Sequence, residues 1–175
     1  MTATVSSPAK YLAREFGAGG RVSSELIDRI KYAADASHFL YTPQVVAEAR
    51  NAKDVAAAFR ASGASGTPLV LRSGGTSLCG QGGGNGIMLD VRKHFRGVEV
   101  RDGGKRVRVQ PGSTVRQVNA RLAPYGRKLG PDPASEGAAT MGGVIANNSS
   151  GMSCGTQFNT YNTCLLYTSP SPRDR

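Results

Sequence analysis

Two glycine-rich stretches contain most of the residues in this chain that could bind a ligand through the backbone. The first, Leu71–Gly84, reads LRSGGTSLCGQGGG and follows the apolar run Pro68–Leu71. Glycine accepts positive φ and lets another group approach the main chain, so the successive N–H groups of Ser73–Ser77 can form a concavity that binds an anion. The hydroxyl groups of that run add donors, and Arg72 adds positive charge at the base of the loop. This composition predicts a phosphate cradle, with a flexible glycine turn as the alternative.

The loop does not follow the common nucleotide-binding patterns. It lacks the GxxxxGK[ST] sequence of a P-loop, and the spacing of Gly74, Gly75 and Gly80 differs from GxGxxG. A different nucleotide-binding fold is therefore required.

The second stretch, Pro131–Gly151, reads PDPASEGAATMGGVIANNSSG. Thr140 is a suitable capping residue, and two glycines follow in what reads as the first turn of a short helix, where N–H groups left free would bind an anion. The segment Pro131-Asp132-Pro133 predicts a stiff, extended backbone against which a flat ligand could lie. Two such backbones in one chain suggest a diphosphate ligand. A glycine-tolerant contact between helices is the alternative.

Short strands and helices alternate along the chain and would position both stretches. Residues 43–72 are expected to form a β-α-β unit whose second strand ends at the glycine loop. Asn51 and either Ser113 or Thr114 are suitable helix caps, and Asp102-Gly103-Gly104 predicts a hairpin turn. The expected helices are Ser24–Ala34, Asn51–Ala61 and Thr114–Pro124, and the first has an apolar face of Leu26, Ile27 and Ile30. The expected strands are Thr42–Val46, Pro68–Leu71, Ile87–Val91, Gly97–Val100 and Arg106–Val109.

Composition narrows the class of protein. The 175 residues carry a net charge of +10, which favours an anionic partner: nucleic acid, a membrane surface or a cofactor. Nucleic acid is not expected, because Trp is absent and no basic run contains interleaved aromatic residues. No apolar window is long enough for a transmembrane segment and no secretory signal opens the chain, so a cytoplasmic location is expected, with a peripheral position at the inner membrane face as the alternative. The three cysteines have no CxxC spacing, so we expect no metal site.

The last twelve residues, CLLYTSPSPRDR, change composition abruptly. We interpret residues 164–175 as the translation of a sequencing adapter, an artefact to be excluded from fold reasoning. The natural sequence is then expected to run to about Thr163 and to continue where this one departs from it. A Ser/Pro-rich disordered tail is the alternative.

Three motifs in order carry a family resemblance. They are PLVLRSGGTSLCGQ, VQPGSTVRQVNARLAPYGRKLGPDPAS and ATMGGVIANNSSGMSCGT. Together they resemble the FAD-linked oxidases of the vanillyl-alcohol oxidase superfamily, which share the PCMH-type FAD-binding domain. Within that family the chain is most similar to D-lactate and glycolate dehydrogenase-like flavoproteins, especially the forms that contain an iron–sulfur domain. The resemblance covers about Asp35 to Thr163.

This resemblance implies an α+β fold. The chain would be the N-terminal, truncated part of a PCMH-type FAD-binding domain: a β-α-β unit followed by a mixed sheet with helices. Residues 1–41 would form an N-terminal helical extension, and residues 42–163 would form the FAD-binding domain, incomplete at its C-terminus.

The resemblance also assigns residues that bind the cofactor. Some members tether the flavin to a histidine in an RSGGH pattern; Thr76 stands at that position here, so non-covalent FAD is expected. His38 and His94 are expected to be surface or packing residues, and Cys79 and Cys154 small buried ones. The pyrophosphate loop would comprise Arg72, Ser73, Gly74, Gly75, Thr76, Ser77 and Gln81, and the second flavin-binding segment Pro131, Asp132, Thr140, Gly142, Gly143, Asn147 and Gly151.

The function that the resemblance implies is the oxidation of a 2-hydroxy acid of the D-lactate or glycolate type. This chain would supply the FAD-binding portion of the flavin-dependent oxidoreductase and would be inactive alone. No catalytic residue is assigned, because the substrate cap is expected beyond Thr163, where an iron–sulfur cluster could also lie; the electron acceptor is unknown. The alternatives are a superfamily oxidase that acts on another alcohol and a non-catalytic basic module that binds polyanions.

Overall fold

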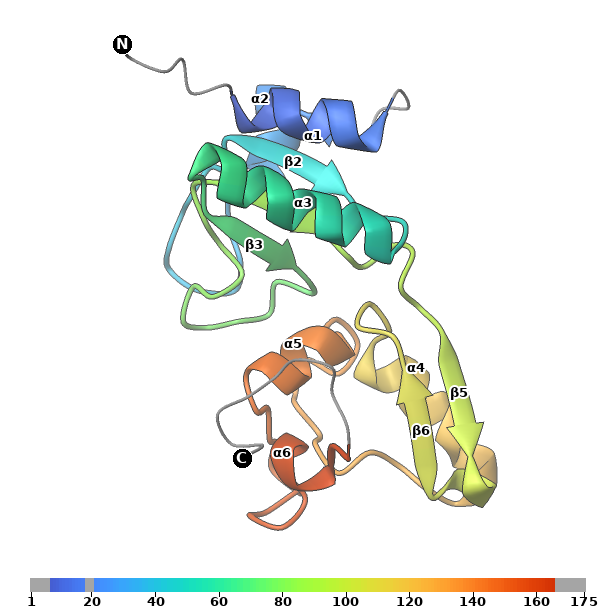
Figure 1. The fold of residues 1–175 in the computed structure, drawn as a ribbon. Helices are drawn as coiled ribbons and strands as arrows, with labels where there is room; N and C mark the ends of the chain where they lie inside the picture. The colour runs from blue at the N-terminus through green and yellow to red at the C-terminus, as the bar shows by residue number, and fades with distance from the viewer. Residues whose placement is uncertain (1–6, 18–20, 166–175) are drawn as a thin grey trace.

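The computed structural model describes residues 7–17 and 21–165, which fold into two lobes (Figure 1). The first lobe contains a four-stranded sheet and its helices, and the second contains a hairpin with short helices. Each lobe has its own cluster of buried apolar side chains. The glycine-rich stretches lie where the two lobes meet, so both lobes position them.

The first sheet has the strand order β1-β2-β4-β3. Strand β4 (Ile87–Asp90) is fully buried and runs parallel to both β2 (Val45–Glu48) and β3 (Leu69–Arg72), while β1 (Val22–Ser23) pairs antiparallel with β2. The register places Glu48 and Arg72 on either side of Asp90. The carboxyl ends of three strands therefore meet at one edge, and the glycine loop leaves from that edge.

Two helices cover one face of this sheet, α1 (Pro8–Phe16) and α3 (Ala52–Ser65). The predicted cap of α3 is confirmed, because the Asn51 side chain accepts hydrogen bonds from the N–H groups of Lys53 and Asp54. The helix continues past the expected end at Ala61 and stops at Gly66, which adopts the left-handed conformation. Helix α1 lies within the expected N-terminal helical extension, but no helix bounds were predicted there.

The expected amphipathic helix at Ser24–Ala34 is shorter and differently oriented. Helix α2 spans only Leu26–Ile30, and its apolar side chains are exposed, by 60% for Leu26, 66% for Ile27 and 51% for Ile30. The predicted apolar face is therefore present but not buried, because α1 and α3 already supply the helical side of the apolar cluster under the sheet.

The second lobe is built on an antiparallel hairpin of β5 (Val98–Arg101) and β6 (Arg106–Val109), joined by the predicted turn at Asp102–Gly104. Helix α4 (Val115–Leu122) begins at Thr114 with a capping box that includes Gln117. The one-turn 3-10 helix Ala123–Tyr125 follows, and α5 (Met141–Ala146) and α6 (Thr160–Thr163) complete the lobe. The strands after the glycine loop are thus divided, since β4 joins the first sheet while β5 and β6 form their own.

The ends of the sequence bear on two expectations. The segment before residue 42 contributes β1 to the first sheet as well as helices. Of the proposed adapter segment 164–175, only Cys164 and Leu165 belong to the described residues, and the remainder lies outside them.

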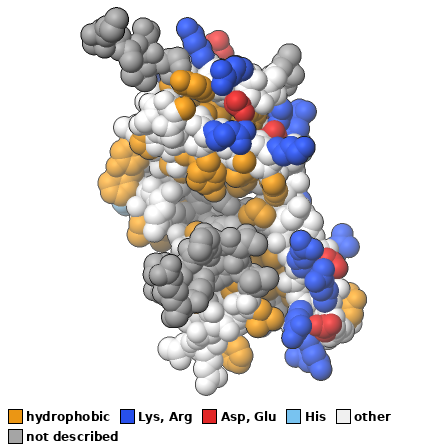
Figure 2. All heavy atoms as spheres, viewed as in Figure 1, with side chains coloured by type: hydrophobic (Ala, Val, Ile, Leu, Met, Phe, Trp, Pro, Cys, Tyr) orange, Lys and Arg blue, Asp and Glu red, His pale blue; other side chains and the backbone are white. Residues whose placement is uncertain are grey.

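In the described ranges, no helix has both the length and the apolar character needed to cross a membrane. Lys and Arg side chains gather over α1 and α3 and along the hairpin (Figure 2).

Candidate functional site

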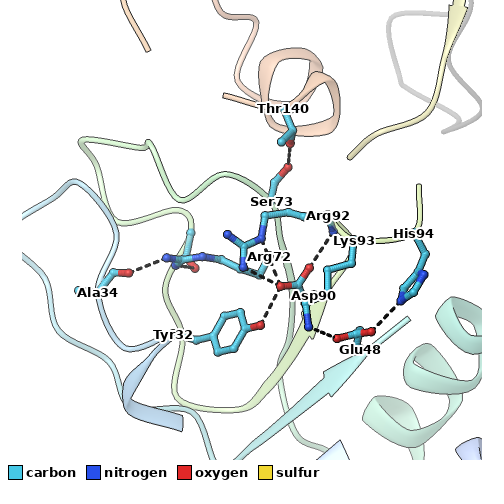
Figure 3. A network of polar contacts seen from close by, with 11 residues as sticks. Tyr32, Ala34, Glu48, Arg72, Ser73, Asp90, Arg92, Lys93, His94 and Thr140 are labelled. Atoms are coloured by element: carbon cyan, nitrogen blue, oxygen red, sulfur yellow. Dashed lines mark hydrogen bonds and ion pairs between the residues drawn. The ribbon is translucent and has the colours of Figure 1, made fainter. Parts of the chain in front are cut away.

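Arg72 ends β3 and ties the base of the glycine loop to the rest of the lobe (Figure 3). Arg72 is buried, with 7% of its surface exposed. Its Nη1 donates to the Gly82 carbonyl oxygen at 2.6 Å, and its Nη2 donates to the Ala34 carbonyl oxygen at 2.6 Å. Burial, together with the nearby charge of Arg92, lowers the pKa of Arg72. The predicted positive charge is therefore present at the loop's base, but the guanidinium holds the backbone rather than facing solvent.

The glycines of this loop are required by close contacts. A Cβ on Gly74 would overlap the carbonyl oxygen of Ala138, and a Cβ on Gly75, whose φ is +67°, would overlap the Arg72 guanidinium. Among the described residues, no backbone hydrogen bond uses the N–H groups of Gly74–Ser77. Four successive donors are therefore free for an anion, as a phosphate cradle needs.

Two side-chain contacts join the glycine loop to the second stretch. The Ser73 hydroxyl hydrogen-bonds the Thr140 hydroxyl (Figure 3), and Asn147 Nδ2 donates to Gln81 Oε1 at 3.3 Å. The Ser77 hydroxyl donates to the same Gln81 oxygen at 2.5 Å. Residues more than 60 positions apart in the sequence thus form one site, which supports the prediction that the two stretches act together.

The start of α5 differs from the expectation of free N–H groups. The Met141 N–H donates to the Ser113 carbonyl oxygen at 2.8 Å, and the Gly142 N–H donates to that of Pro111 at 2.9 Å. The prediction is wrong for these two groups, because the turn before α4 supplies their acceptors. A Cβ on Gly142 would lie 2.8 Å from the Pro111 Cβ, so this glycine serves close packing. A Cβ on Gly143 would instead lie 3.7 Å from the Ser73 side chain, and among the described residues no backbone hydrogen bond uses the Gly143 N–H.

Pro131, Asp132 and Gly151 form a separate group. The Asp132 carboxylate accepts from the Ser153 N–H at 3.1 and 3.2 Å, and these bonds with Ser153 lower the pKa of Asp132. Gly151 has φ +144°, and a Cβ there would overlap Asp132. Within the described ranges, no hydrogen bond or ion pair connects these three residues to the glycine loop, so the structure brings together only part of the predicted set.

A buried carboxylate beside the loop was missed by the sequence analysis. Asp90 is fully buried and accepts hydrogen bonds from the Tyr32 hydroxyl at 2.7 Å and Arg92 Nη2 at 2.7 Å (Figure 3). Burial acts to raise the pKa of Asp90, but the bonds from Arg92 prevail and lower it. Burial and the Asp90 carboxylate raise the pKa of Tyr32 to about 12. The available signal was an Asp that ends the apolar run Ile87–Leu89.

Two hollows flank the junction of Ser73 and Thr140. One, of about 260 Å³, is basic, and the other, of about 240 Å³, is apolar. The basic cleft is lined by Gly74, Arg92, Lys93, Arg96, Gly112, Thr114, Ala138 and Thr140, and the apolar groove by Val55, Leu71, Ser73, Val91, Phe95, Pro111, Gly142, Gly143 and Ala146. A cleft of positive charge suits phosphate groups, and an apolar groove suits a flat ring system.

The exposure of the histidine and cysteine side chains tests the remaining expectations from the sequence. His38 is exposed, and His94 Nε2 lies 2.7 Å from Glu48 Oε1 (Figure 3), as expected of surface histidines. Cys154 is buried, as predicted, but Cys79 is exposed because it lies at the outer turn of the glycine loop. In the part of the chain that the structure describes, no group of three His, Cys, Asp or Glu residues could hold a metal ion.

Comparison with known proteins identifies the family. A family model described as an FAD binding domain matches residues 43–169, which is well over half of the chain. The chain therefore belongs to this family of FAD binding domains. The family resemblance that the three sequence motifs indicate is confirmed.

Two curated relatives extend this result. D-2-hydroxyglutarate dehydrogenase from Pseudomonas putida is 32% identical over 160 residues, which cover 85% of this chain and 16% of that protein. Glycolate oxidase subunit GlcD from Escherichia coli is 33% identical over 91 residues, which cover 50% of this chain and 18% of that subunit. The chain thus spans less than a fifth of the length of these relatives.

Solved structures share the fold. An alkyldihydroxyacetonephosphate synthase matches with a TM-score of 0.73 at 18% identity, over 86% of this chain and 32% of that chain. A glucooligosaccharide oxidase from Acremonium strictum matches with a TM-score of 0.70 at 22% identity, over 89% of this chain and 32% of that chain. The predicted α+β fold of a PCMH-type FAD-binding domain is confirmed, and the chain is truncated relative to these proteins.

Proposed function

We propose that the glycine loop and the start of α5 hold the pyrophosphate of FAD. The observation that carries this proposal is the junction of the two stretches at Ser73–Thr140 and Gln81–Asn147, beside four free N–H groups. Backbone donors and hydroxyls in a glycine-rich concavity fit a dianionic diphosphate. The residues present therefore fit the group that the family binds. The assigned set is Arg72, Ser73, Gly74, Gly75, Thr76, Ser77, Gln81, Thr140, Gly143 and Asn147.

Each part of this set has its own task. The N–H groups of Gly74–Ser77 donate to the phosphate oxygens, while Arg72 fixes the loop's shape from behind. The basic cleft raises the local concentration of anions, and the apolar groove excludes water from a flat ring. Met141 and Gly142 serve the fold, since their N–H groups are occupied. Pro131, Asp132 and Gly151 are assigned to the cofactor site by the family resemblance alone; Asp132 and Gly151 form a parallel bridge within their own segment.

We propose that the cofactor is held without a covalent bond. The Acremonium strictum glucooligosaccharide oxidase carries 6-S-cysteinyl, 8α-N1-histidyl FAD. This chain has Thr76 at the loop position that holds the tethering histidine in the RSGGH pattern of some family members. His94 is engaged with Glu48 at the far side of the sheet edge (Figure 3), which supports the same proposal.

The proposed activity of the whole protein is the oxidation of a 2-hydroxy acid. Two relatives support this proposal, because one is named for D-2-hydroxyglutarate and the other for glycolate, and both compounds are 2-hydroxy acids. Bound FAD supplies the acceptor of two electrons from the substrate carbon, and the residues of this chain bind and orient it. The cytoplasmic location and an iron–sulfur cluster stay predictions of the sequence.

Flavin release tests the proposal. The purified protein that carries this chain should be yellow, and acid precipitation should leave the flavin in the supernatant. A 2-hydroxy acid should bleach the visible flavin absorbance under anaerobic conditions. A colourless protein that takes up no added FAD would overturn the cofactor assignment, and flavin that stays with the pellet would overturn non-covalent binding.

A further inference from the structure

Residues 33–41 form a small closed loop that precedes the segment matched by the family model. Ala34 and Leu40 form an antiparallel bridge, and the Tyr41 N–H donates to the Ala33 carbonyl oxygen at 2.9 Å. The rings of Phe39 and Tyr41 stack with centroids 5.9 Å apart and planes inclined by 15°. We refer to residues 33–41 as the clasp loop.

Three hydrogen bonds connect the clasp loop to the glycine loop. Arg72 Nη2 donates to the Ala34 carbonyl oxygen at 2.6 Å (Figure 3), and the Ala36 N–H donates to the Gly75 carbonyl oxygen at 3.0 Å. At the far end of the glycine loop, the Gly82 N–H donates to the Asp35 carboxylate at 3.1 Å. The clasp loop therefore contacts both ends of the segment that carries the four free N–H groups.

Aromatic contacts add to these hydrogen bonds. Gly80 has φ +78°, and a Cβ there would lie 2.7 Å from the Phe39 ring. A Cβ on Gly83 would lie 3.2 Å from the Tyr41 ring. These two glycines are explained by the stacked rings rather than by a ligand. Phe39 remains 52% exposed and Tyr41 42% exposed, so the rings cover the outer side of the glycine loop while their other sides meet solvent.

We propose that the clasp loop is a positioning element for the cofactor loop, with Asp35 as its main positioning residue. This inference rests on the proposed FAD function. A loop that is ordered before its ligand arrives loses less conformational freedom on binding. Asp35 orders the clasp as well as the glycine loop, since its carboxylate also accepts from the Ser37 N–H at 2.8 Å. It acts through the Gly82 N–H.

Hydrogen exchange in the cofactor-free 175-residue chain tests the positioning role directly. Asp35→Ala should speed exchange in residues 73–84 about tenfold, the loss expected for one hydrogen bond to a charged group. Exchange in α3 should stay unchanged. The matched control is Asp28→Ala, because Asp28 lies on α2 and its carboxylate, among the described residues, bonds only Ser23 and Lys31. Unchanged exchange in residues 73–84, or an equal rise throughout the chain, would overturn the proposal.

Two further variants keep this test decisive. Asp35→Asn retains one acceptor oxygen, so its exchange should fall between wild type and Asp35→Ala. Such a rescue would not follow from a general loss of folding. If Asp35→Ala does not fold, Phe39→Ala removes the contact with Gly80 from an exposed side chain, and it should speed exchange at residues 79–83 alone. Wild-type exchange there would contradict the proposal.

FAD titration then separates this proposal from the proposed function. Asp35→Ala should raise the dissociation constant for FAD about tenfold while Asp28→Ala leaves it unchanged. If the whole protein that carries this chain binds no FAD but the exchange results hold, the proposed function fails and the clasp's structural effect stands. If wild type binds FAD and Asp35→Ala binds it equally well, the clasp's role in cofactor binding is refuted.

Discussion

A side chain at Gly75 should act on Arg72 before it reaches any ligand. Gly75 has φ +67°, and an added Cβ would overlap the Arg72 guanidinium. Gly103 is a matched control, since its φ is +60° and an added Cβ would meet nothing within 4 Å. Gly75→Ala and Gly103→Ala therefore share the backbone penalty and differ in the contact with Arg72.

The expected magnitudes differ clearly. The left-handed conformation costs a residue with a Cβ about 1–2 kcal/mol, which is the whole effect expected for Gly103→Ala. At Gly75 the displaced guanidinium also loses at least one of its two hydrogen bonds to carbonyl oxygens. A hydrogen bond to a charged group contributes about 1.5–3 kcal/mol. Gly75→Ala should therefore lower the free energy of unfolding by about 2.5–5 kcal/mol.

Urea unfolding of wild type and the two variants measures this difference. The double variant with Arg72→Met supplies a further check, because Gly75→Ala should cost only the backbone penalty once the guanidinium is absent. Equal losses for Gly75→Ala and Gly103→Ala would refute the conclusion that Arg72 lies against this glycine. So would a double variant whose losses simply add.

Three further predictions concern single residues. The pKa of Tyr32 is raised to about 12, so the stability that its neutral hydroxyl contributes is complete below pH 10.0 and is lost as pH rises through the folded-state pKa. Tyr32→Phe should remove an absorbance step near pH 12 at 295 nm, and a step that persists would contradict the contact with Asp90. Asn51→Ala should lower the free energy of unfolding by about 1 kcal/mol through loss of the α3 cap, measured by urea unfolding, whereas no change would show that the cap is dispensable. In a Cys164→Ser background, which removes the partly exposed third thiol, Cys79 should react with a thiol reagent in the folded protein and Cys154 only after unfolding. A fast phase that persists when Cys79→Ser is added would contradict the exposure assigned to Cys79.

Local signals in the sequence predicted much of the fold. Strand β6 has the bounds expected from its alternating pattern, and the caps at Asn51 and Thr114 are as predicted. These features depend on residues within a few positions of one another, so a pattern in the sequence can reveal them. The glycine loop follows its strand for the same reason.

Features that depend on distant partners were not predictable in this way. The exposure of α2 results from the covering of the sheet by α1 and α3, which lie on either side of it in the sequence. The N–H groups of Met141 and Gly142 are occupied by carbonyls of the turn at residues 111–113. Asp90 could be noted as an Asp after an apolar run, but its contact with Tyr32 spans 58 positions. Tertiary contacts decide each of these cases.

The central claim is that the N–H groups of Gly74–Ser77 bind a pyrophosphate, and amide NMR shifts during ligand titration test it most directly. Titration of the isotope-labelled chain with FAD and with ADP should move the amide signals of Gly74–Ser77 and Gly143 most, even where binding is weak. AMP, which has no pyrophosphate, should move them less. Saturating FAD that leaves these signals in place, or shifts dominated by residues remote from both stretches, would contradict the account.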